Sequence, residues 1–311
     1  MTHKKPLNPE CIWDLKAQLG EAPIWVESEQ ALYFVDVFGQ KIHRYDPASD
    51  TKLSWDSPGK PCFIVASTNE KFVVGIDKEL YWFNPKTGRM DLWINLTGQK
   101  SKIDFSNTRL NDAYVDAQGR LWFSNMDAEE EEANGSLFLL DWEENNPRIS
   151  CQDQGYVVPN GPLVSPDGKV LYHNHTPEQH MYRFEVDEDG NLSNKELLVK
   201  VEEGCPDGMG MDKEGNIWVC LYGGHQMQFY SKDGELREVI PFPCPNVTKV
   251  AFGGPDLTTA FVTTATRGID AKDLVKYPLA GGLFSFKVSI PGRPQKPFSV
   301  PSKANLKEQV F

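Results

Sequence analysis

The sequence predicts an all-β fold, a six-bladed β-propeller with four antiparallel strands in each blade. Three observations predict it. One pattern returns six times, the segment after each copy has the form of a further hairpin, and no stretch carries the apolar period of an amphipathic helix. The units cover nearly all of the 311 residues, and their spacing of roughly 40 to 50 residues is typical of propeller blades.

The first half of each unit is a short strand, a polar turn that is often Asp-x-x-Gly, and a strand rich in aromatic and β-branched residues. Turn residues of this kind punctuate hairpins because they tolerate the backbone angles that a tight turn requires. We therefore expect two paired strands in each of six ranges: 22–36, 62–76, 112–125, 161–174, 208–221 and 249–264.

The second half of each unit also reads as strand, turn and strand, with Asp-Pro, Asn-Pro, Asp-Gly or Pro-Gly at most of the turns. The expected ranges are 41–56, 79–94, 136–151, 181–199, 227–242 and 283–300. The N-terminal segment 11–18 lies outside this count. We expect it to supply the outer strand of the last blade and so to close the ring.

We expect a single domain over residues 1–311, with flexible termini at residues 1–9 and 302–311. The alternative is a β-sandwich or two smaller β domains. No linker and no change of composition interrupts the period, which favours the single propeller. Aromatic residues that recur at matching positions of the units, Trp25, Trp122, Trp218 and Phe261, are expected in the core.

Composition narrows the classes of partner. The net charge of −12 argues against nucleic acid and anionic membrane surfaces, because both require Lys and Arg to neutralise their phosphates. No apolar segment has the length of a membrane span or the form of a signal peptide. The six cysteines show no paired spacing and are expected to be reduced. These features predict a cytoplasmic protein, a monomer or weak homo-oligomer, that acts on a small molecule.

The residues at the start of the first strand of each unit should meet, because the innermost strands of a propeller surround a central channel. They are Glu21, Cys62, Asn111, Asn160, Asp207 and Thr248. Carboxylate and amide oxygens suit Ca²⁺, Mg²⁺ or Mn²⁺, and they do not exclude Zn²⁺ or Fe²⁺. Spacing alone leaves two interpretations open: a divalent metal site, or polar residues that cap the strands and hold water.

Four segments resemble the signatures of the SMP-30/gluconolactonase/luciferin-regenerating-enzyme family. They are Leu19–Pro23 (LGEAP), Arg109–Asp112 (RLND), Pro159–Gly161 (PNG) and Pro206–Met209 (PDGM). The resemblance implies a six-bladed propeller with one divalent cation held by Glu21, Asn160 and Asp207. It also implies that Arg109 and Asn111 bind substrate, and that Glu129 lies in the substrate pocket.

The resemblance further implies hydrolysis of a sugar lactone to its aldonic acid. The opening Trp13–Ala17 (WDLKA) is similar to the pentonolactonase branch, which makes a pentonolactone such as xylono- or arabinonolactone the expected substrate. Asp207 is the expected base, since one carboxylate oxygen can bind the cation while the other accepts a proton from water. The alternatives are a lactonase or isomerase of a different small lactone, and a non-catalytic propeller stabilised by its metal.

Three residues depart from the family pattern or carry uncertain chemistry. Lys249 stands where a small residue is frequent. It could bind the carboxylate product, but we expect its ammonium to reach solvent. His175 replaces a common Asp and could lie behind the site, although a position at a strand end is the commoner outcome. Cys62 is expected to be a buried, inert thiol.

Overall fold

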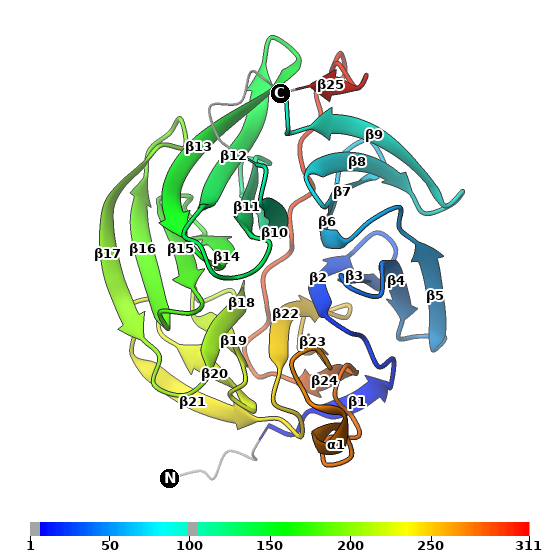
Figure 1. The fold of residues 1–311 in the computed structure, drawn as a ribbon, viewed down its shortest axis with the longest axis vertical. Coiled ribbons are helices and arrows are strands. Elements are labelled where there is room, and N and C mark those ends of the chain that lie inside the picture. The colour runs from blue at the N-terminus through cyan, green and yellow to red at the C-terminus, as the bar shows by residue number, and fades with distance from the viewer. Residues whose placement is uncertain (1–6, 99–104, 311) are drawn as a thin grey trace.

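The computed structural model describes residues 7–98 and 105–310, and it confirms the propeller predicted from the repeats. Within these residues the strands form six sheets that surround one axis, and each sheet has at least four strands (Figure 1). The expected flexible N-terminus, residues 1–9, lies largely outside the described residues.

The innermost strand of each blade faces the axis. These strands are β2 (Gly20–Val26), β6 (Pro61–Ala66), β10 (Thr108–Val115), β14 (Pro159–Val164), β18 (Cys205–Met211) and β22 (Val247–Gly253). The second strands are β3 (Ala31–Asp36), β7 (Phe72–Ile76), β11 (Leu121–Asp127), β15 (Val170–His175), β19 (Ile217–Tyr222) and β23 (Thr259–Thr264).

The third strands are β4 (Lys41–Asp46), β8 (Glu79–Asn84), β12 (Gly135–Glu143), β16 (His180–Val186), β20 (Gln226–Tyr230) and β24 (Leu283–Lys287). The outer strands are β5 (Thr51–Asp56), β9 (Arg89–Asn95), β13 (Asn146–Tyr156), β17 (Leu192–Lys200), β21 (Leu236–Pro241) and β1 (Glu10–Trp13). We number the blades 1 to 6 in the order in which their innermost strands occur, from β2 to β22.

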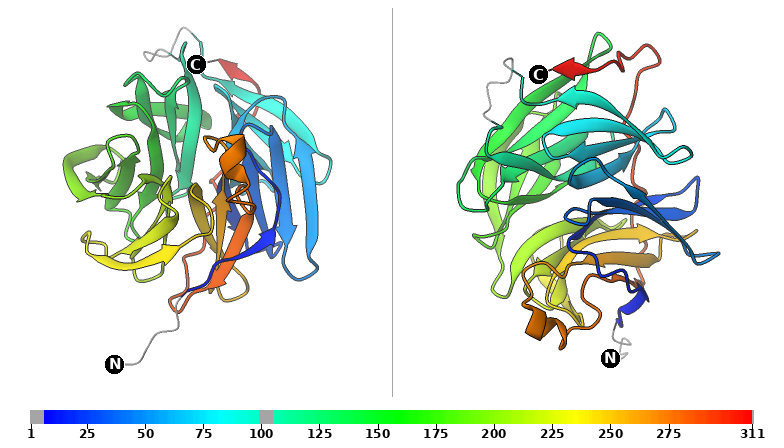
Figure 2. Two further views of the ribbon diagram at one scale, coloured as in Figure 1. Left: turned by 60° about the horizontal axis from the view of Figure 1, so that its bottom comes forward. Right: turned by 45° about the vertical axis from the view of Figure 1, so that its right-hand side comes forward.

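The last blade joins the two ends of the chain. β1 pairs antiparallel with β24 as the outer strand of blade 6, so the expected closure by the N-terminal segment is confirmed. Figure 2 shows β1 beside β24. At the seam between blades 6 and 1, the Trp25 and Phe261 rings stack with their centroids 5.6 Å apart. Trp122 and Trp218 are buried as well, so the expected core positions are confirmed.

The predicted hairpin over 283–300 is wrong in its second half. Only Leu283–Lys287 forms a strand of blade 6, and the chain then runs across the middle of the propeller (Figure 1). Prolines at 291, 294 and 297 lack the N–H groups that a strand ladder needs. We call residues 288–300 the strap.

The strap bonds to several blades in turn. Lys213 of blade 5 donates to the Pro291 carbonyl at 2.9 Å, and the Gln295 side chain accepts from the Trp25 amide of blade 1 at 2.8 Å. Phe298 donates from its amide to Ala66 of blade 2 at 2.8 Å. A cavity of only about 50 Å³ remains between strap residues 293–296 and the innermost strands. The strap therefore closes one end of the channel.

Two further features complete the fold. Gln309 and Val310 form β25, which pairs parallel with β9. They lie in the segment 302–311 that was expected to be flexible, and its flexibility stays a prediction. The one α-helix within the described residues is α1 (Ala271–Leu274). Across residues 7–98 and 105–310, no helix is long and apolar enough to cross a membrane.

We expect the substitution Phe298→Ala to lower the free energy of unfolding by about 3–5 kcal/mol, the usual cost of emptying an aromatic core position. The Phe298 side chain is fully buried, and its ring packs on Trp93 and Trp142 at centroid distances of 6.1 and 5.8 Å. Denaturant unfolding measures the loss. Leu236→Ala, on the exposed β21 strand, is the matched control. Equal unfolding free energies for the two variants would show that the strap adds little stability.

Candidate functional site

Each innermost strand carries a register shift at the predicted channel position. The antiparallel pairing is interrupted beside or across Glu21, Cys62, Asn111, Asn160, Asp207 and Thr248. A bulge bends a strand locally and re-aims its side chain. The repeated irregularity therefore explains how six residues of otherwise regular strands come to face one axis.

Two of these residues are carboxylates that influence each other. Burial, and then the negative charge of Asp112, raise the pKa of Glu21 to about 8. Burial, and then the charges of Glu21 and Asp112, raise the pKa of Asp207 well above its usual range. Lys249 lowers both pKa values through its positive charge. Three carboxylates thus share a space in which water solvates them poorly.

The two predicted asparagines belong to one hydrogen-bonded chain on the channel wall. Arg109 Nη1 donates to Asn111 Oδ1 at 3.0 Å, and Asn111 Nδ2 donates to Asn160 Oδ1 at 2.8 Å. Asn160 Nδ2 donates to the Thr176 hydroxyl at 2.9 Å, which donates to the Pro206 carbonyl at 2.8 Å. The chain joins blades 3, 4 and 5 and ends one residue before Asp207. Sequence reasoning did not assign Thr176 this role.

The floor of the site is an ion pair between Lys249 and Asp112. Their side chains are 7% and 3% exposed, so the expectation that the lysine reaches solvent is wrong. Asp112 also accepts from the amides of Ala113 at 2.7 Å and Gly161 at 2.8 Å. The aliphatic part of Lys249 passes Gly208 so closely that a Cβ there would lie 2.5 Å from Lys249 Cγ. Glycine beside Asp207 is thereby explained.

Sequence reasoning did not find this pair, although a signal was present. Asp112 directly follows Asn111 in the RLND segment, and Lys249 is the residue after the channel position Thr248. A charged residue of each sign next to a channel position predicts a pair when the innermost strands meet. In the structure β22 lies between β18 and β2. From this position in blade 6, the Lys249 side chain extends across the axis to Asp112 of blade 3.

Cys62 and His175 take structural positions. Cys62 is buried, and burial raises the pKa of its thiol to about 11, which confirms the expected buried, poorly ionised group. His175 accepts from the Val157 amide at 3.1 Å and lies 3.1 Å from Glu178, while burial lowers its pKa. Its ring therefore contributes to the local structure of blade 4.

The acidic loop after β11 is organised by Asp127. The Asp127 carboxylate accepts from the Glu129, Glu131 and Glu132 amides at 3.2, 3.0 and 3.3 Å, and these bonds lower its pKa. The Glu129 side chain is exposed, and its place in the substrate pocket stays a prediction. Its neighbour Glu130 forms an ion pair with Arg267 at 3.0 Å.

The oxygen atoms of Glu21, Asn160 and Asp207 fit a divalent cation. Within the described residues, no group of three or more His, Cys, Asp or Glu side chains could hold a metal, and the set expected here includes the amide of Asn160. Two carboxylates and an amide are hard oxygen donors. Burial first, and then neighbouring carboxylates, raise the pKa values of Glu21 and Asp207, and a positive charge between the two would favour their charged forms.

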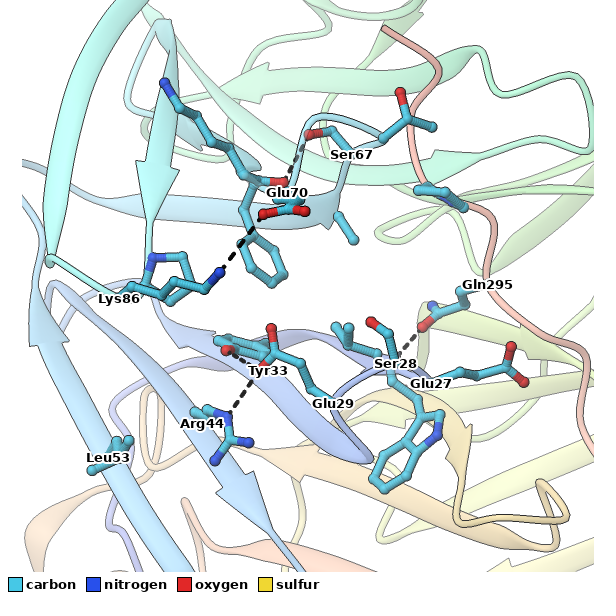
Figure 3. A pocket seen from close by; sticks show the side chains of 18 of the residues that line it. Glu27, Ser28, Glu29, Tyr33, Arg44, Leu53, Ser67, Glu70, Lys86 and Gln295 are labelled. Carbon is cyan, nitrogen blue, oxygen red and sulfur yellow. Dashed lines mark hydrogen bonds and ion pairs between the residues drawn. The ribbon is translucent and has the colours of Figure 1, made fainter.

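Two cavities larger than the one beside the strap lie away from the channel. One of about 660 Å³ lies between blades 1 and 2, beside the turn 27–30 that ends β2 (Figure 3). Its walls carry a hydrogen bond from the Tyr33 hydroxyl to Glu29 and an exposed Glu70–Lys86 ion pair. Because β2 begins at the channel site and ends at this cavity, the two lie at opposite ends of the strand.

Residues 19–266 match the family described as "SMP-30/Gluconolactonase/LRE-like region". The chain belongs to this family. It is 31% identical to a 6-deoxy-6-sulfogluconolactonase of Pseudomonas putida, over 91% of this chain and 96% of that protein. It is 33% identical to a pentonolactonase of Haloferax volcanii, over 91% and 95%. The structure of the calcium-binding protein regucalcin from Agrobacterium tumefaciens superposes with a TM-score of 0.86 at 23% identity, over 94% and 98%.

We expect Lys249→Met to lower the free energy of unfolding by about 3–5 kcal/mol, because it leaves the buried Asp112 carboxylate without its counter-charge. Denaturant unfolding in the presence of a chelator measures the loss without coupling to cation binding. Lys232→Met, which removes one partner of the exposed Lys232–Asp233 pair, should cost less than about 1 kcal/mol. A Lys249→Met variant as stable as the Lys232→Met variant would contradict a buried ion pair.

Proposed function

We propose that this protein hydrolyses a sugar lactone to its aldonic acid with the help of one divalent cation. The observation that carries the proposal is the hydrogen bond from Asn111 to Asn160. It joins the expected substrate-binding pair, Arg109 and Asn111, to the expected cation ligands in one channel. Relatives that are 31% and 33% identical are named as lactonases of a sulfogluconolactone and a pentonolactone, which supports the same chemistry.

The cation would be held by Glu21, Asn160 and Asp207. When bound, a divalent cation supplies Lewis acidity to the ring ester carbonyl and stabilises negative charge on its oxygen. Calcium is favoured by the hard oxygen donors, and regucalcin, a solved relative in fold, is described as calcium-binding. Zn²⁺, Mn²⁺, Mg²⁺ and Fe²⁺ remain members of the proposed set.

The chain's own residues orient the lactone and move the proton. A guanidinium has five N–H donors, so Arg109 can hold the Leu110 carbonyl and Asn111 and still donate to sugar hydroxyls. We assign Asp207 the role of base, accepting a proton from the attacking water on its free carboxylate oxygen and returning it to the departing ring oxygen. The Asn174 side chain steadies this residue by donating to the Asp207 carbonyl at 2.7 Å.

The proposals on the identity of the lactone, the oligomeric state and the location rest on the sequence. A pentonolactone is the proposed substrate within the lactones, supported by the 33% identity to a pentonolactonase. Hydrolysis or isomerisation of another lactone, and a cation that only stabilises the fold, are the competing functions. The expected monomer or weak homo-oligomer, the cytoplasmic location and the pocket role of Glu129 stay predictions.

Acid release from pentono- and hexonolactones in weak buffer tests the reaction. We expect rapid release that chelation abolishes and Ca²⁺ or Zn²⁺ restores. The chelated protein is the control because lactones open spontaneously in water. Rates equal to the chelated control across the panel would refute the lactonase, and thermal stabilisation by cation without turnover would then favour a structural metal.

Two variants separate the expected roles in the channel. Asp207→Ala should lose cation binding and at least about 100-fold in turnover, because it removes both a ligand and the base. Asn111→Ala should bind Ca²⁺ normally but raise the KM for the lactone roughly tenfold, the effect of one lost hydrogen bond. Calorimetric titration with Ca²⁺ and steady-state kinetics measure both. Loss of Ca²⁺ binding in Asn111→Ala would make Asn111 a ligand, and normal activity of Asp207→Ala would refute the mechanism.

A further inference from the structure

The loop between β3 and β4 holds an aromatic ring, Phe38, at the open end of the channel. The Asp36 carboxylate fixes this loop, since it accepts from the Gln18 and Leu19 amides at 3.0 Å each and from the Gly39 amide at 2.9 Å. Phe38 remains partly exposed. The loop therefore presents the Phe38 ring on a rigid support.

Three cationic side chains gather around this ring. The Arg267 guanidinium carbon lies 4.0 Å from the ring centroid, Lys60 Nζ 5.1 Å and the Arg109 guanidinium carbon 6.0 Å. Attraction between a cation and an aromatic face holds each of them there. In a protein with a net charge of −12, three converging cations are a local reversal of the overall charge.

Three hydrogen bonds fix the backbone of Arg267, although this residue lies on a loop. Its carbonyl accepts from the Tyr222 hydroxyl at 2.6 Å and from the Asn246 side-chain amide at 2.7 Å, and its amide donates to Gln18 at 2.9 Å. These contacts belong to blades 5, 6 and 1. The Arg267 side chain is 39% exposed and is therefore accessible to a ligand.

One of the three cations, Arg267, already forms an ion pair with a carboxylate of the protein. Glu130 of blade 3 lies 3.0 Å from Arg267, which follows β23 of blade 6. Blades 3 and 6 stand on opposite sides of the ring (Figure 1). The ion pair therefore spans the channel mouth, and both side chains are about 40% exposed, at 39% and 42%. An exposed pair of this kind contributes little stability and is easily exchanged.

Arg109 makes the cationic group continuous with the proposed lactone site. Its Nη1 donates to Asn111 on the channel wall, and its guanidinium carbon lies within 6.0 Å of the Phe38 ring centroid. A lactone whose ester lies at Glu21, Asn160 and Asp207 would extend its far end past Arg109. The side chains that meet this far end are Lys60 and Arg267.

We propose that Lys60, Arg109 and Arg267 form a subsite for an anionic group, and that the preferred substrate is a sugar lactone with a sulfonate, phosphate or carboxylate remote from the ring ester. Glu130 holds the subsite in the free protein and leaves it when the lactone binds. The inference rests on the proposed lactonase function, and it puts an anionic sugar lactone in place of the neutral pentonolactone as the preferred substrate.

The kinetic test compares lactones that differ in this group. Wild-type kcat/KM is measured for gluconolactone, 6-phosphogluconolactone, 6-deoxy-6-sulfogluconolactone and a glucaric acid lactone, with neutral pentonolactones beside them. We expect at least one anionic lactone to exceed every neutral one by about tenfold or more, the effect of a charge-assisted hydrogen bond. The preference should shrink in high salt, which screens exposed charges. The three anions distinguish phosphate, sulfonate and carboxylate.

Three variants test the residues. Arg267→Met should reduce the ratio of anionic to neutral kcat/KM about tenfold, and Glu130→Gln should raise kcat/KM for the anionic lactone because it removes a competitor. Arg237→Met, an exposed arginine on β21, is the matched control and should leave the ratio unchanged. Thermal unfolding confirms that each variant is folded. An Arg267→Met variant that loses activity equally on anionic and neutral lactones would overturn the subsite, because Arg267 would then have only a structural role.

A binding measurement separates this inference from the lactonase proposal. Calorimetry with 6-phosphogluconate and gluconate needs no turnover, and we expect the phosphorylated acid to bind wild type about tenfold more tightly, but not Arg267→Met. Equal binding, or neutral lactones turned over as fast as anionic ones, would overturn the subsite while the lactonase stands. Absence of turnover on every lactone would overturn the lactonase and the inferred substrate class together.

Discussion

The gathering of three carboxylates around one axis, two buried and Glu21 partly buried, is the constraint on which this structure depends. Glu21, Asp112 and Asp207 lie close enough for each to affect another's charge, and burial raises the pKa of both Glu21 and Asp207. Such a group is tolerated only where opposite charge or N–H donors compensate it. Lys249 and two backbone amides compensate Asp112, whereas Glu21 and Asp207 face the channel. Glu21 accepts from the Ala22 amide and Lys249 lowers both pKa values, but burial outweighs these contacts, so a cation between Glu21 and Asp207 would stabilise their charged forms.

Closure of the ring keeps these groups in place. The innermost strands come from six blades, so any slip between the blades would separate the carboxylates. β1 completes blade 6 with the opposite end of the chain, and the strap bonds to blades 1, 2 and 5 across the closed end of the channel. Because the strap crosses one end of the ring, the proposed approach to the site is from the other end, past Phe38 and Arg267.

The fold and the channel positions could be predicted from the sequence because the strands repeat, and a side chain at one place in every copy points the same way. The Lys249–Asp112 pair was not predicted, because the partners lie on blades 6 and 3 and their contact depends on how the ring closes. The strap was misread because its residues resemble a hairpin locally, while its three prolines prevent a ladder. Residues that break the repeat are therefore the ones that need a structure.

Residues on strands and residues on loops have different proposed roles at the site. Glu21, Asn160 and Asp207 lie on strands beside a similar register shift in each blade, so as the proposed cation ligands they would hold the reacting ester in the same place for any lactone. Phe38, Glu130 and Arg267 lie on loops at the open end, where a substitution alters the entrance without disturbing the ring. In the proposed mechanism the strands carry the cation ligands and the substrate-binding Arg109 and Asn111, and the loops add the groups that meet the far end of the substrate. Relatives named as lactonases of a sulfogluconolactone and of a pentonolactone are consistent with one fold whose substrate groups vary.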